Sequence, residues 1–306
     1  MNTIRIHYFF LANFSFLALM FHFFFNDDFI DNNLYLLLFC LFLILSIGIS
    51  HGALDNMRGK KILLPMLKNK WYLLFYPCYI SLILIVIISW VSYPNLTLLL
   101  FLLIASYHFG EEDLSFFLKN KGILFNLISF LKGFLIITLS FHFNYETTTL
   151  FFDYLMVPEE NYKFLTKFKS ILFSTNLILA TLGIIYLFKS HIDRLTSVLF
   201  EILVVTLSFM HLPLIFSFTL YFCFLHSSKH IISLSRKLDP SNHKNGLKLF
   251  FIKAIPLTLL TAVTSILTIY FLGDNLNKNI IQIIFIGLAS LTLPHIILEV
   301  LGKKNE

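Results

Sequence analysis

Runs of about twenty apolar residues recur along the whole chain, and they restrict the folds that it can adopt. The hydrocarbon core of a bilayer is about 30 Å thick and takes about 20 residues of α-helix to cross. Backbone N–H and C=O groups find no water there, so segments of this kind are predicted to be helical. The segments that qualify lie at residues 5–25, 33–53, 71–93, 95–117, 122–143, 167–188, 194–210, 212–234, 248–272 and 277–300.

The composition supports a membrane protein. Hydrophobic residues make up 58% of the 306 residues and charged residues 13%, whereas a soluble domain has about 45–50% and about 25%. Mean hydropathy is +0.82. We therefore predict an all-α, polytopic transmembrane helical bundle of about ten helices (eight to ten), forming a single integral membrane domain over residues 1–306. The range reflects residues 194–234, which form one broken helix or two, divided at His211-Leu212-Pro213.

Charged residues are concentrated in the loops and alternate in sign. The loops at residues 26–31 and 144–161 are rich in acidic residues, whereas those at 58–70 and 236–248 are rich in lysine and arginine. Basic loops mark the cytoplasmic side of a membrane protein. This pattern predicts a multi-pass protein of the cell inner membrane with both termini in the cytoplasm. Because the basic residues serve topology, the net charge of +6 does not indicate a nucleic-acid partner.

Two histidines lie four residues apart inside one apolar segment. They are His226 and His230, in the run Tyr221-Phe222-Cys223-Phe224-Leu225-His226-Ser227-Ser228-Lys229-His230. Residues at i and i+4 of a helix share one face, so both imidazoles can reach one ion. Unpartnered polar groups in hydrocarbon cost several kcal/mol, which favours a use for these nitrogens.

Further histidines are expected at the same depth. Four of the predicted helices run inward, and each carries histidine in its inner half. The residues are His51, His108, His226, His230 and His295. A single buried histidine is often a hydrogen-bonded core residue, but five at one level predict a metal site. Imidazole ligands suit iron, copper, zinc or nickel and not Mg²⁺ or Ca²⁺.

Acidic residues lie about one turn beyond two of these histidines. Asp55 follows His51, and Glu111 and Glu112 follow His108. A carboxylate in such a place can accept the proton of the second ring nitrogen and so fix the imidazole tautomer. The alternative reading is a charged helix end at the membrane interface.

Four motifs together resemble a known family. They are Ser-His-Gly-Ala-Leu-Asp at residues 50–55, Tyr-His-Phe-Gly-Glu-Glu-Asp at 107–113, the segment 213–230, and Leu-Pro-His at 293–295. In this order they resemble the Brp/Blh family of bacterial and archaeal membrane-bound β-carotene 15,15′-dioxygenases. The resemblance runs from about His51 to Glu299 and leaves the first helix without a distinctive motif.

The resemblance implies a specific chemistry. It implies an iron-dependent oxygenase that uses O₂ to cleave the central 15,15′ double bond of all-trans-β-carotene and gives two molecules of retinal. It implies that Fe²⁺ is held by His51, His108, His226 and His230, with His295 as an outer or pocket residue. The implied partners are β-carotene, O₂ and the lipid bilayer, with a functional link to a retinal-binding rhodopsin.

A polyene dissolved in the membrane needs an apolar, aromatic path. Aromatic residues near the implied ligands are predicted to line it, although for each residue taken singly ordinary helix packing is the better explanation. They are Tyr107, Phe109, Phe218, Tyr221 and Phe222.

Two other functions stay open at the level of the residues. One is a transporter or ion channel with a histidine-lined path, which would not retain stoichiometric iron. The other is a membrane lipid desaturase or hydroxylase, which needs more histidine boxes than the single one at His226 and His230.

Overall fold

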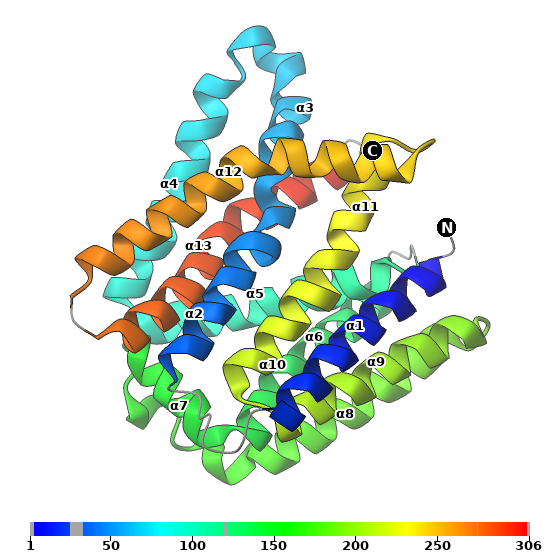
Figure 1. Cartoon of the computed structure of the whole chain (residues 1–306), viewed down its shortest axis with the longest axis vertical. Coiled ribbons are helices and arrows are strands. Elements are labelled where there is room, and N and C mark those ends of the chain that lie inside the picture. The colour runs from blue at the N-terminus through cyan, green and yellow to red at the C-terminus, as the bar shows by residue number, and fades with distance from the viewer. Residues whose placement is uncertain (1–2, 25–32, 119–121, 274, 305–306) are drawn as a thin grey trace.

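The computed structural model of the chain describes residues 3–24, 33–118, 122–273 and 275–304, and every regular element in these ranges is helical (Figure 1). The α-helices are α1 (Thr3–Phe24), α2 (Leu34–Leu43), α3 (Asp55–Leu67), α4 (Tyr72–Ser92), α5 (Pro94–Ser115), α6 (Ile123–Phe143), α7 (Tyr145–Tyr154), α8 (Leu165–Phe188), α9 (Ile192–His211), α10 (Leu214–Leu220), α11 (Ser228–Leu238), α12 (His243–Phe271) and α13 (Leu276–Lys304). Shorter elements are the π-helical turns η1 (Ile44–Gly48) and η5 (Tyr221–Ser227) and the 3₁₀ turns η2 (Ile49–Leu54), η3 (Lys68–Lys70) and η4 (Glu159–Asn161).

The ten apolar segments predicted from the sequence coincide with helices wherever the structure describes them. Seven helical spans in the described ranges are long and apolar enough to cross a membrane. They are Thr3–Phe23, Leu34–Lys70, Tyr72–Ser92, Ile123–Phe143, Leu165–Phe188, His243–Phe271 and Leu276–Gly302. The other three predicted segments fall on α5, on α9 and on the stretch α10–η5–α11.

Residues 194–234 form two helical stretches and not one broken helix. Helix α9 ends at His211, and α10 begins at Leu214 after Pro213. A proline disfavours helical backbone at the residue before it. Leu212 accordingly has extended dihedral angles, φ −122° and ψ 156°. The chain reverses here and sends the histidine pair back along the bundle.

Glycines let α5 and α6 pack with their backbones in contact. A Cβ atom on Gly110 would lie 1.7 Å from the Ser129 carbonyl oxygen, and one on Gly133 would lie 1.8 Å from the Ser106 carbonyl oxygen. Small residues at such crossings allow close approach of membrane helices. The contact brings the acidic end of α5 against α6.

The histidine pair begins in the π-helical turn η5, which joins α10 to α11. Turns of this kind are rare and occur frequently at functional sites. Ser227 Oγ of η5 donates a hydrogen bond to the Gly48 carbonyl oxygen of η1 at 2.9 Å. A Cβ atom on Gly48 would lie 2.6 Å from Phe222 Cε1, so glycine lets the two π turns approach. His226 therefore lies where two irregular turns meet.

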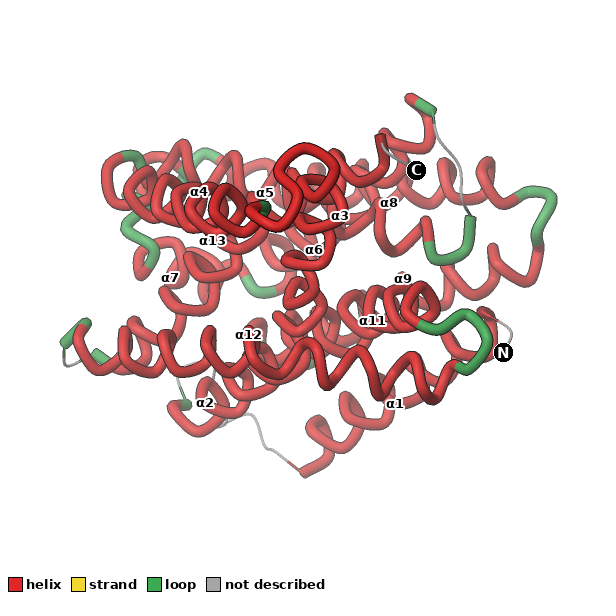
Figure 2. Tube along the Cα trace, turned by 90° about the horizontal axis from the view of Figure 1, so that it is seen from above, coloured by secondary structure: helices red, strands yellow, loops and turns green. Residues whose placement is uncertain are grey.

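Helix α13 lies inside the bundle and contacts helices α3, α4, α5 and α12. Seen from above, it lies between α4 and α12, and both helices contact it (Figure 2). Helices α3 and α4 form a hairpin that extends beyond the other helices (Figure 1). The space bounded by α4, α12 and α13 contains the cavity described below.

Candidate metal centre

Four buried imidazoles converge from α5, η5, α11 and α13. The ring centroid of His108 lies 5.2 Å from that of His226 and 5.4 Å from that of His295. The centroid of His230 lies 5.7 Å from that of His295. We call these four residues the histidine cluster. His51 belongs to η2, but its side chain lies outside the described part of the structure, so its predicted role as a ligand stays a prediction.

A carboxylate that the sequence reading did not single out joins the histidine cluster. Glu299 lies one helical turn beyond His295 on α13. Its Oε2 is 3.6 Å from His108 Nδ1, and its Oε1 is 3.9 Å from His295 Nε2. The i, i+4 spacing from His295 was the available signal, since it matches the spacing of His226 and His230.

Two of the acidic residues expected to hold imidazoles contact histidines of the cluster. Asp55 Oδ1 and Oδ2 lie 2.9 Å and 3.0 Å from His295 Nδ1, so Asp55 supports the histidine on α13. Glu112 Oε2 lies 2.5 Å from His230 Nδ1. Glu111 instead accepts a hydrogen bond from Ser115 Oγ at 3.4 Å.

The donor set fits a transition metal. The ligand atoms of His108, His295 and Glu299 lie within 4.8 Å of one another, as do those of Glu112, His230 and Glu299. Imidazole nitrogens with a few carboxylate oxygens suit a first-row transition ion better than Mg²⁺ or Ca²⁺. The described side chains can therefore supply both the ligands and the hydrogen bonds that orient them.

Beside the histidine cluster lies a ring of four buried charged side chains. Lys132 Nζ is 2.5 Å from Asp113 Oδ2 and 2.9 Å from Glu201 Oε1. Lys229 Nζ is 3.2 Å from Asp113 Oδ1 and 2.7 Å from Glu201 Oε2. This buried charge ring links α5, α6, α9 and α11, and its formal charges sum to zero. Lys132 and Glu201 each stand as the one charged residue of an apolar run, which is a signal for function or pairing inside a membrane.

Asp113 connects the charge ring to the histidine cluster. Its Oδ1 lies 3.7 Å from His226 Nδ1, and its Oδ2 accepts a hydrogen bond from Tyr221 Oη at 2.9 Å. On the far side, His7 of α1 lies with Nδ1 3.6 Å from Glu201 Oε2. The ring thus places a carboxylate beside one imidazole of the cluster and reaches α1 on its other side.

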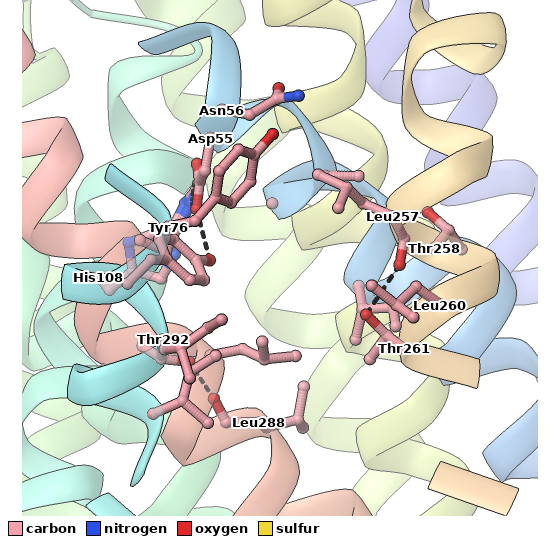
Figure 3. A pocket seen from close by; sticks show the side chains of 18 of the residues that line it. Asp55, Asn56, Tyr76, His108, Leu257, Thr258, Leu260, Thr261, Leu288 and Thr292 are labelled. Carbon is pink, nitrogen blue, oxygen red and sulfur yellow. Dashed lines mark hydrogen bonds and ion pairs between the residues drawn. The ribbon is translucent and has the colours of Figure 1, made fainter. Parts of the chain in front are cut away.

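An apolar cavity of about 240 Å³ opens beside the histidine cluster. His108, His295, Phe109 and Phe222 contribute to its wall. Figure 3 shows side chains near His108 facing those of α12 across the cavity, namely Asp55, Asn56 and Tyr76 on one side and Leu257, Thr258, Leu260 and Thr261 on the other.

A second apolar cavity of about 90 Å³ adjoins the first, and Phe218 lines it. Phe109 lines both cavities. Tyr107 and Tyr221, which the sequence reading placed on the substrate path, line neither of these two cavities. The half-exposed Tyr107 donates a hydrogen bond to Asn126 Oδ1 at 3.4 Å, and the hydroxyl of Tyr221 points to Asp113.

These features define a helical membrane protein with a buried site of histidines and carboxylates beside an apolar cavity. A family model described as "Beta-carotene 15,15'-dioxygenase" matches residues 42–301. The chain therefore belongs to the β-carotene 15,15′-dioxygenase family, which confirms the resemblance seen in its motifs. Because this is a family of enzymes, the transporter and channel alternative is set aside.

One relative is similar to this chain over most of its length. The β-carotene 15,15′-dioxygenase of an uncultured marine bacterium 66A03 is 26% identical over 264 residues, which are 84% of this chain and 90% of that protein. No solved structure matches the chain.

Proposed function

We propose that this protein is an iron-dependent β-carotene 15,15′-dioxygenase that produces retinal. One observation carries the proposal: the region matched by the family model contains the whole histidine cluster and Glu299. The apolar cavity beside the cluster supports a polyene taken from the bilayer. A retinal-binding rhodopsin is the kind of protein that this product would serve.

We keep His51, His108, His226 and His230 as the proposed ligands of Fe²⁺. The distances of His295 and Glu299 from His108 make these two residues further candidates for the same ion. When bound, ferrous iron would supply the redox-active centre at which O₂ is activated. The metal content of purified variants, discussed below, decides between these ligand sets.

The surrounding side chains support one tautomer for His230. Arg58 Nη2 lies 3.4 Å from His230 Nε2, and a guanidinium group can only donate hydrogen bonds. The proton of the neutral ring therefore sits on Nδ1, where Glu112 accepts it. Asp55 faces Nδ1 of His295 in the same way. Both carboxylates leave the lone pair on the opposite ring nitrogen. In His230 that nitrogen faces Arg58, so Arg58 would have to move aside for Nε2 to bind a metal.

The proposed reaction needs no external electrons or protons. The double bond between C15 and C15′ breaks, and each carbon gains one oxygen atom, so one O₂ and one β-carotene give two retinal molecules. The protein must therefore hold the polyene, exclude water and orient the imidazoles. On this account the buried charge ring supports His226 and has no protons to deliver.

Retinal is expected as the only major product of cleavage. Symmetric cleavage places the centre of the polyene at the site, and the apolar cavity beside the histidine cluster supports that placement. The measurement is pigment analysis of a β-carotene-accumulating bacterium that expresses the protein, with cells lacking it as the control. Longer apocarotenals in quantity contradict symmetric cleavage. Unchanged β-carotene in the presence of iron-loaded protein contradicts the substrate.

We further propose ten membrane crossings, a single membrane domain and cytoplasmic termini in the cell inner membrane. The start of α1 and the end of α13 lie toward the same end of the helices in Figure 1, which supports a shared side. Reporter fusions after Lys61, Lys121 and Lys304 are expected to report cytoplasm, and those at Asp28 and Glu159 the outer side. Asp28 and Lys121 lie outside the described residues. An external carboxyl terminus contradicts this topology.

A further inference from the structure

The two apolar cavities meet at a shared pair of aromatic side chains. Phe101 and Phe109, both on α5, line the first cavity as well as the second. The ring centroid of Phe109 lies 4.7 Å from that of His226 and 6.1 Å from that of His108. The place where the two cavities meet is therefore in contact with the histidine cluster.

The two cavities differ in the exposure of the residues that line them. The rim of the first includes Ile80 of α4 and Leu260 of α12, whose exposed fractions are 53% and 59%. Both side chains are apolar and belong to helices predicted to cross the membrane. By contrast, no residue that lines the second cavity is exposed. The first cavity thus lies beside exposed apolar side chains of α4 and α12, from which a molecule dissolved in the bilayer can reach it.

The walls of the second cavity suit an unsaturated hydrocarbon. Phe218 and Phe285 lie with their ring centroids 5.4 Å apart, and Phe151 lies 6.0 Å from Phe285. Aromatic rings offer large flat apolar faces. The polar groups that line this cavity are hydroxyl groups already bonded to backbone carbonyls, as for Ser106 with Leu102 and Thr148 with Ser140.

We propose that the two cavities are the two arms of one polyene site, joined at Phe101 and Phe109. One half of the substrate occupies the first cavity, which it enters from the bilayer. The other half occupies the second cavity, so that the central double bond lies beside the histidine cluster. This inference rests on the proposed function, because central cleavage of a symmetric polyene requires apolar space on both sides of the site. The second cavity then limits the length of the inner half.

A bulky side chain in the second cavity tests this inference. Ala105 lines only that one of the two cavities and is 5% exposed, so Ala105→Phe fills it from α5. We expect kcat/KM for β-carotene to fall about tenfold or more. The new phenyl ring and one half of the substrate would have to share the second cavity, and overpacking of this kind weakens binding by about that factor. A shortened polyene, β-apo-8′-carotenal, can place its truncated half in the filled arm, so its kcat/KM should change much less. Leu103→Phe, at an exposed position of the same helix, is the matched control and should alter neither.

A binding measurement on metal-free protein separates this inference from the proposed function. Induced circular dichroism of the added carotenoid reports binding, and Ala105→Phe should weaken it for β-carotene more than for the apocarotenal. Ala105→Leu, a smaller plug, should give an intermediate effect if the larger variant folds poorly. Equal losses for both substrates, or no loss for either, overturn the two-arm site. If the variants bind β-carotene and the apocarotenal as expected but the iron-loaded wild-type protein does not cleave β-carotene, the proposed function alone is overturned. If the wild-type protein does not bind β-carotene, both proposals are overturned.

Discussion

Alanine at His226 or His230 is expected to abolish cleavage and to remove most of the bound iron. The two side chains are proposed to supply half of the ligands from one rigid stretch, η5 followed by α11. Iron quantification and retinal formation on the purified variants are the measurements. Full iron and full turnover in either variant would mean that the four-histidine site is wrong.

Two histidines outside the cluster serve as controls. His142, whose ring is stacked on Phe173 at 4.6 Å, and His211, whose ring lies 5.8 Å from His22, should tolerate alanine without loss of iron. His51→Ala and His108→Ala should behave like His226→Ala if the resemblance gives the correct set.

His295→Ala is the variant that discriminates between the two ligand sets. As an outer residue it should retain iron and lose about tenfold to a hundredfold in activity or metal affinity. Its position opposite His108 also allows it to be a ligand, in which case the variant loses the metal. Glu299→Gln makes the same distinction for the carboxylate on α13.

Removal of one member of the buried charge ring is expected to destabilise the fold strongly. Lys132→Met leaves two buried carboxylates facing a single lysine, and Glu201→Gln leaves two buried lysines facing a single carboxylate. Breaking a buried ion pair by removing one partner costs about 3–5 kcal/mol, because an uncompensated charge remains. The measurement is the free energy of unfolding in mixed detergent micelles.

The double variant gives the sharper result. The double variant Lys132→Met, Glu201→Gln leaves one buried carboxylate facing one buried lysine, so the ring is again neutral. The loss in free energy of unfolding should therefore be well below the sum of the two single losses. An exposed pair on the same protein is the control: Lys163 and Glu159 lie 3.7 Å apart and are 74% and 69% exposed. Lys163→Met should cost about 0–1 kcal/mol. Additive costs for Lys132 and Glu201 would show that the ring does not act as a unit.

The helices were predictable from the sequence because each segment must satisfy its own backbone hydrogen bonds in the bilayer. Apolar run length therefore gave the positions of the long helices, whereas α3 and α7 lie in segments predicted as loops. Pro213 marked where residues 194–234 divide, but the sequence left open whether they form one broken helix or two. The spacing of His226 and His230 was readable because it is local, and their role as joint ligands stays a prediction. These inferences need no knowledge of which helices are neighbours.

Partners from distant segments were not predictable in this way. Lys132, Glu201 and Lys229 are brought together only by the packing of α6, α9 and α11, which the sequence does not reveal. Tyr221 was expected on the substrate path but points to Asp113. Its nearness in sequence to His226 motivated that prediction, and such nearness does not give the direction in which a side chain points.

The contact between α5 and α6 also bears on how the chain enters the membrane. Asp113 and Lys132 lie on consecutive helices and form the closest pair of the ring, at 2.5 Å. Their backbones meet through Gly110 and Gly133, so the two helices can associate soon after the second is synthesised. The hairpin of α5 and α6 then enters the bilayer with Asp113 and Lys132 paired. An unpaired charge at the centre of a helix costs about 2.5–3.5 kcal/mol during insertion. Gly110 and Gly133, which position the acidic end of α5, thereby lower the free-energy cost of inserting Lys132 into the bilayer.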